Sequence, residues 1–151
     1  MTKTFSRRLG RSLAVVAAAL WLSFPAQADV GQIKVATGQV FVDRKGESLA
    51  GRVGLVLEAD DVLRTGADSS VGITMRDNSL LSAGPNSILS LERFEFDPTT
   101  SEGRFDARLQ RGTLAVVSGR IAKRSPQAMT VRTPSAVLGV RGTEFVVSVD
   151  E

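Results

Sequence analysis

Short stretches of alternating apolar and polar residues, each closed by a turn signal, constrain the fold of this chain more than any other feature. Residues 71–75 read V-G-I-T-M and residues 105–109 read F-D-A-R-L, so every second side chain is apolar. A period of two places the apolar side chains on one face of a β-strand. No stretch after residue 28 has the 3.6-residue apolar period of an amphipathic helix. The sequence therefore predicts an all-β fold of short strands.

Pairs of Asp or Asn with Ser mark several of the turns between these strands. Asp68-Ser69, Asn78-Ser79 and Asn86-Ser87 each precede an apolar alternating run, and such side chains stabilise turns by bonding their own backbone. The repetition weakly favours stacked strands of a β-solenoid-like kind, but a β-sandwich has the same pattern of frequent turns. Both architectures stay open, as does the oligomeric state, because an exposed strand edge in either fold could pair two copies.

Residues 1–28 have the order of a secretory signal peptide. Residues 1–11 carry four basic residues and no acidic one, residues 13–24 are mainly apolar, and residues 25–28 read P-A-Q-A. The apolar run is shorter than the roughly 20 residues that cross a bilayer comfortably. We therefore expect cleavage before Asp29, a periplasmic or secreted location, and no membrane span after cleavage.

Composition excludes most catalytic and metal chemistry. The chain has no Cys and no His, which removes disulfides, thiolate metal sites, His-based catalytic triads and the common zinc sites. No catalytic residue, metal ligand or cofactor is predicted. Four of the 19 basic residues lie in residues 1–28, which leaves 15 against 16 acidic residues in the remainder. A nearly neutral domain gives no electrostatic reason to expect a nucleic-acid partner.

Six short segments of the chain follow one another in an order that is more specific than any one of them. They are residues 38–42, 63–71, 75–79, 85–89 and 109–114, and finally residues 131–145, V-R-T-P-S-A-V-L-G-V-R-G-T-E-F. In this order they resemble the FecR domain of bacterial exported regulators. The resemblance implies an all-β domain of short stacked strands, here residues 29–151, that binds other proteins or ligands in the periplasm and is not catalytic.

The chain departs from the signalling members of that family. Those regulators look like a cytoplasmic anti-sigma segment, a transmembrane helix and then this domain. Here about a dozen residues precede the apolar run, and the chain ends six residues after Phe145. We therefore expect a FecR-like domain that is exported alone, without a direct anti-sigma role.

The candidate contact residues are mostly basic and lie in or beside turns. They are Arg120, Lys123 and Arg124 in a polar loop over residues 119–127, and Arg132, Arg141 and Thr143 in the closing segment. A purely structural role is the alternative at each turn, because Gly142 and Pro134 have backbone preferences that turns and bends use. The adjacent pair Asp60-Asp61 is expected in a solvated turn at the start of a strand.

Taken together, these features predict a non-catalytic binding or regulatory module of the periplasm. It would act in envelope signalling by recognising an envelope or periplasmic protein partner through strand edges and turn residues. The alternative is a structural protein that binds glycans or cell-wall polymers. Against that alternative, residues 29–151 contain neither Trp nor Tyr, the side chains on which sugar rings usually stack.

Overall fold

The computed structural model describes residues 29–140 and 144–150, and this part of the chain is built almost entirely from strands. The elements in chain order are β1 (Gly31–Thr37), β2 (Val40–Arg44), β3 (Glu47–Ala50), β4 (Val56–Leu57), β5 (Val62–Thr65), β6 (Ser70–Met75), β7 (Leu80–Ala83), β8 (Ile88–Phe96), β9 (Gly103–Val117), the helix α1 (Arg120–Arg124), the 3₁₀ helix η1 (Pro126–Ala128), β10 (Met129–Arg132), β11 (Val137–Gly139) and β12 (Glu144–Val149).

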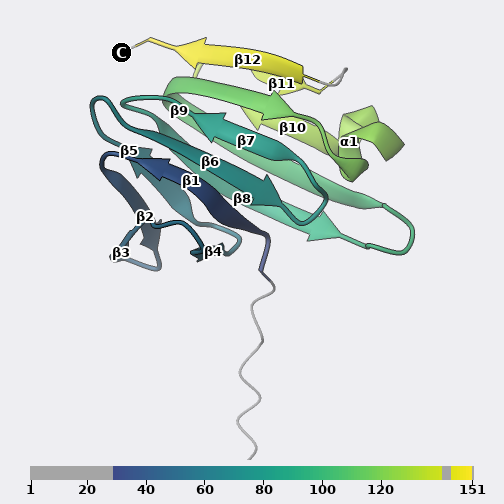
Figure 1. Cartoon of the computed structure of the whole chain (residues 1–151). Helices are drawn as coiled ribbons and strands as arrows, with labels where there is room; N and C mark the ends of the chain where they lie inside the picture. Colours follow the sequence, from purple (N-terminus) through teal and green to yellow (C-terminus); the bar gives the residue numbers. More distant parts are fainter. Residues whose placement is uncertain (1–28, 141–143, 151) are drawn as a thin grey trace, which may run out of the picture.

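The long strand β9 joins two halves of one curled sheet (Figure 1). Up to Arg111 it pairs with β8 and β10, and from Gly112 onward it pairs with β7 and β12. The β8 half contains β3, β2, β5, β8, the first part of β9, β10 and β11. The β7 half contains the second part of β9, β7, β6, β1, β4 and β12. All of these pairings are antiparallel except that between β9 and β10.

Apolar side chains from both halves form one core cluster. Burial alternates strictly along β6 and β7, as a period of two requires. The all-β prediction is confirmed. Of the two architectures that the sequence left open, a curled antiparallel sheet around one core is closer to a sandwich than to stacked coils. The largest buried side chains are those of Ile33, Leu57, Leu63, Ile73, Met75, Leu81, Leu89, Leu91, Phe105, Leu109, Leu114 and Ile121.

Gly112 lies at the point where β9 passes from one half to the other. Its φ of +87° belongs to the left-handed region that L side chains rarely adopt. A Cβ atom at this position would also lie 2.5 Å from the Cα atom of Ser87. Two independent constraints, backbone conformation and close packing, therefore require glycine at this corner.

Each of the three Asx-Ser turns makes a long-range hydrogen bond of the same kind, which the sequence did not reveal. Asp68, Asn78 and Asn86 all have positive φ angles, and the serine that follows each of them is buried. The hydroxyl oxygens of Ser69, Ser79 and Ser87 accept the backbone N–H groups of Gln39, Gly119 and Thr113, respectively. Each turn is thereby attached to a distant strand end or corner, so the turns stabilise tertiary structure as well as local structure.

Two predictions about local structure are wrong. Residues 119–127 contain α1 and most of η1 instead of an irregular loop, because Ile121 and Ala122 are buried on the inner side of this short turn of helix. Of the pair Asp60-Asp61, Asp60 is exposed in a turn as predicted, but Asp61 is not in a solvated turn. It is fully buried and accepts hydrogen bonds from the Arg44 guanidinium at 2.7 and 2.8 Å and from the Glu58 backbone N–H at 2.8 Å.

Within the described residues, no helix has both the length and the apolar character that crossing a membrane requires.

The corner at Gly112 generates a stability prediction with a matched control. Gly46 has nearly the same φ, +86°, but a Cβ atom there would meet nothing within 4 Å. We expect Gly46→Ala to lower the free energy of unfolding by about 1 kcal/mol through backbone strain alone. Gly112→Ala adds a steric clash, and we expect a loss of about 2–4 kcal/mol. Urea denaturation followed by circular dichroism measures both, and equal losses would contradict the role of the Ser87 contact.

Candidate functional site

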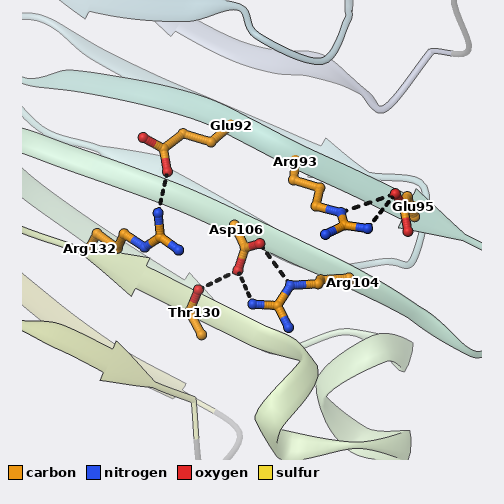
Figure 2. A network of polar contacts seen from close by, with 7 residues as sticks. All are labelled: Glu92, Arg93, Glu95, Arg104, Asp106, Thr130 and Arg132. Carbon is orange, nitrogen blue, oxygen red and sulfur yellow. Dashed lines mark hydrogen bonds and ion pairs between the residues drawn. The ribbon is translucent and has the colours of Figure 1, made fainter.

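A network of charged side chains covers the outer side of the β8 half. It lies on β8, β9 and β10, opposite the core, and Figure 2 shows most of its members. We call it the charged face and define it by Glu92, Arg93, Glu95, Arg104, Asp106, Arg108, Thr130 and Arg132.

Glu92 holds two arginines that would otherwise repel each other. Arg108 and Arg132 are directly opposite on β9 and β10, and like charges in that position destabilise a sheet. The Glu92 carboxylate accepts from Arg108 Nε at 2.5 Å and contacts Arg132 NH1 at 3.4 Å. A register shift between Leu91 and Arg93 leaves Glu92 at a β-bulge, which is the irregularity that typically redirects a side chain.

Asp106 is the buried anchor of the same face. Its carboxylate accepts two hydrogen bonds from Arg104, at 2.8 and 3.2 Å, and one from the Thr130 hydroxyl. Asp106 itself is only 6% exposed. Burial raises the pKa of Asp106, but the hydrogen bonds from Arg104 and Thr130 outweigh it, so the pKa lies below its ordinary value.

A further ion pair continues this outer surface onto β2 and β5. Arg64 donates to Asp43 at 2.5 and 3.0 Å, and its guanidinium lies 5.6 Å from the ring centre of Phe41. The hydrogen bond from Arg64 lowers the pKa of Asp43. The surface therefore consists of alternating, mutually compensating charges. Such an arrangement suits recognition of another charged surface by exchange of ion-pair partners.

The three basic residues of α1 have different surroundings. Arg120 donates to the Ser101 hydroxyl and to the Pro98 carbonyl oxygen, and it lies over the Phe96 ring, so it fixes the 97–102 loop against the helix. Arg124 is exposed and lies 3.9 Å from Glu102. It also lines a cleft of about 400 Å³ between the helix and that loop. Lys123 is exposed.

The predicted contact residues are therefore not gathered in one site. Arg132 belongs to the charged face at the far end of β10, whereas Arg120, Lys123 and Arg124 lie on α1, before β10 begins. Arg141 and Thr143 fall outside the described residues, so their proposed role stays a prediction. Among the residues that the structure describes, no group of acidic side chains could hold a metal ion.

The sequence did not identify the outer side of the β7 half, which is mainly apolar, with Lys34 and Glu144 among the residues that line it. One row of directly opposed residues crosses it, Val35–Gly72–Ser82–Ala115–Val146. The exposed side chains of Leu80 and Val117 lie in the neighbouring row. The small residues leave a hollow of about 360 Å³ between the larger ones. We call this surface the apolar face.

The signal for both faces was present in the sequence but could not be interpreted without strand pairing. Residues 92–95 and alternate positions of residues 104–108 are rich in charge, whereas the small residues Gly72, Ser82 and Ala115 each lie between two apolar neighbours in the chain. Which strands lie side by side, and in which register, decides whether such side chains meet.

Comparison with known proteins identifies the family. A family model described as FecR protein matches residues 61–151, which is more than half of the chain. The protein therefore belongs to the FecR family, as the ordered motifs indicated. The matched segment begins just before β5, so β1 to β4 precede it. The family is consistent with a regulatory signalling module and is generally not enzymatic. No curated protein and no solved structure matches the chain.

Asp106 generates a pH-dependent prediction. Since its pKa is lower in the folded than in the unfolded chain, its ionised form stabilises the fold above pH about 4, and this stabilisation is lost as the pH falls through the folded-state pKa. Asp106→Asn removes the charge and leaves a similar shape. We expect it to lower the free energy of unfolding by about 1–2 kcal/mol at pH 7 and to reduce the difference between pH 7 and pH 3, both measured by urea denaturation.

Glu95→Gln is the control for this measurement, because Glu95 forms an exposed ion pair with Arg93 on the same face. Exposed pairs contribute little, so we expect a change within about 0.5 kcal/mol. If Asp106→Asn retains the full pH dependence of the unmodified chain, the assigned role of Asp106 is wrong.

Proposed function

We propose that this protein is a non-catalytic binding module of the bacterial envelope that recognises another protein through the charged face. The observation that carries the proposal is the unequal sharing of Glu92. Arg108 has a short contact with this carboxylate, whereas Arg132 has only a long one at 3.4 Å and is half-exposed.

Within residues 29–140 and 144–150, the Arg132 guanidinium forms no hydrogen bond besides the one to Glu92, which leaves donors available on the outer side of the sheet. An arginine guanidinium pairs with a carboxylate through two parallel hydrogen bonds when the geometry permits. An acidic side chain of a partner can supply these bonds while Glu92 continues to hold Arg108. Asp106, Arg104 and Thr130 keep the surrounding surface rigid, which limits the entropy lost on binding.

Membership of the FecR family supports a regulatory role in signalling for this binding. The rigid, strand-based surface is suited to protein recognition, since ion pairs between two surfaces give specificity and fast association. Cell-wall polymers that carry phosphate or carboxylate groups would bind the same arginines. The captured partner therefore has to be identified as a protein or a polymer by mass spectrometry.

The test is chemical cross-linking in intact cells of the tagged full chain, followed by mass spectrometry. We expect one envelope protein to be captured in a stoichiometric amount. The double variant Arg108→Ala, Arg132→Ala should reduce this capture at least tenfold, because both guanidiniums are removed. Arg52→Ala is the matched control, since Arg52 is exposed in the loop before β4 and lies outside the charged face.

Urea denaturation shows whether the variants remain folded. Arg141→Ala is tested separately for the contribution predicted from the sequence. Capture of cell-wall fragments alone would replace protein recognition with the polymer-binding function. An equal loss of capture in Arg52→Ala would show that the loss is not specific to the charged face and would contradict its role in binding.

Export is a separate part of the proposed function and has its own test. The order of basic, apolar and small residues in residues 1–28 supports removal of this segment by signal peptidase. Mass spectrometry of the N-terminal peptide of the protein from the periplasmic fraction should show a chain that begins at Asp29. Recovery of the intact N-terminus from the cytoplasm would contradict export.

A further inference from the structure

The unpaired strand edges of the described residues differ in how well they are protected. β3, β4 and β11 each have one free side, and they are four, two and three residues long. β12 has six residues and pairs with β9 without a bulge. Figure 1 shows it at the upper border of the sheet. Natural proteins protect such edges with short length, charges, Pro or bulges, and β12 has a single charged residue, Glu144, at its first position.

The side chains of β12 are also incompletely covered. Phe145, Val147 and Val149 point toward the core but stay partly exposed, and Val146 on the outer side is 64% exposed. Val146 continues the row of the apolar face. A strand added along this edge would complete the sheet hydrogen bonds and cover apolar side chains on both of its faces.

We propose that the occupant of this edge is a second copy of the chain, paired β12 to β12 in antiparallel orientation about a two-fold axis at Val146. This register places Val146 opposite Val146 of the second copy, Phe145 opposite Val147, and Glu144 opposite Ser148. Inward-facing residues meet inward-facing residues, so both cores stay on the same side of the combined sheet. An interface of this kind is self-complementary, as a two-fold axis requires.

Two registers neighbour this one. An axis at Phe145 would pair only residues 144–146 of the described strand with one another, whereas the axis at Val146 pairs residues 144–148. Charge excludes the other neighbour. An axis at Val147 would place Glu144 opposite Asp150 at both ends of the contact, and like charges directly opposite each other destabilise a sheet. With the axis at Val146, each Glu144 lies opposite a neutral hydroxyl. The strand is therefore able to pair with itself without a charge conflict.

The contact is small, which determines its strength. One six-residue edge with its flanking side chains buries less than the roughly 1,200 Å² of total surface that stable complexes exceed. We therefore expect a weak dimer that forms at high protein concentration and dissociates on dilution. The charged face lies on the other half of the sheet, and this pairing uses none of the residues that define it.

Single cysteines test the pairing and its register, because the unmodified chain has none. Directly opposed residues in an antiparallel pair have Cβ atoms about 4.5–5.5 Å apart, close enough for a disulfide after small adjustments. In the full chain under mild oxidation, we expect Val146→Cys to form disulfide-linked dimers at least tenfold faster than Ser148→Cys, which would face Glu144. Val53→Cys is the control for random collision, since Val53 is 63% exposed in a loop.

Sedimentation velocity over a range of concentrations tests the same pairing without cysteines. The unmodified chain should show reversible dimerisation. Val146→Lys should weaken it at least tenfold, and Val53→Lys should leave it within twofold. The proposal is overturned if the unmodified chain stays monomeric up to about 1 mM, a concentration at which even a Kd of about 1 mM would be visible. It is also overturned if the three cysteine variants cross-link at equal rates.

Discussion

The fold depends on the attachment of its turns to distant parts of the chain by buried serine hydroxyls. Ser87 accepts the N–H of Thr113 and packs against Gly112, where β9 changes partners, and Ser69 and Ser79 make corresponding contacts with Gln39 and Gly119. The contact of the Gly119 N–H is buried and the other two contacts are part-buried, so leaving these N–H groups unpaired would cost free energy, most of all at Gly119. Because the contacts lie at corners and strand ends, they determine where the single sheet curls, and the curl brings the apolar sides of its two halves onto one core.

Curling also gives the molecule two outer surfaces of opposite character. Along each strand the period of two directs alternate side chains inward and outward, so the outward positions are free to differ between the halves. On the β8 half they are charged and compensated in pairs, with Glu92 and Asp106 as the anchors. On the β7 half they are mainly small or apolar, with Lys34 and Glu144 as charged exceptions around its hollow. One core therefore supports a charged outer surface on one half of the sheet and a mainly apolar outer surface on the other, with β12 next to β9 on the apolar half.

Local sequence rules located most of the strands and turns but not the ionic contacts. Asp60-Asp61 read as a solvated turn because adjacent acidic residues are usually hydrated. Asp61 is buried because Arg44, 17 residues earlier, supplies its counter-charge across the fold. Residues 119–127 were predicted to be a loop because they are polar and basic. They form a short helix instead, because Ile121 and Ala122 are buried against the core. In both cases a contact with a residue distant in sequence takes part, from Arg44 to Asp61 and from the Ile121 N–H to the Asp77 carboxylate.

The sequence by itself determined that the chain forms short strands, where most of them turn, and that it belongs to the FecR family, because alternation, turn chemistry and ordered motifs are local properties. Only the tertiary structure decided that the strands form one curled sheet, that Arg132 shares Glu92 with Arg108, that Arg120 holds a loop, and that β12 lies at an edge of the sheet formed by the described residues. The physical reason is that strand pairing and register are set by contacts between distant residues. A shift of one position would exchange the inner and outer side chains of a whole strand.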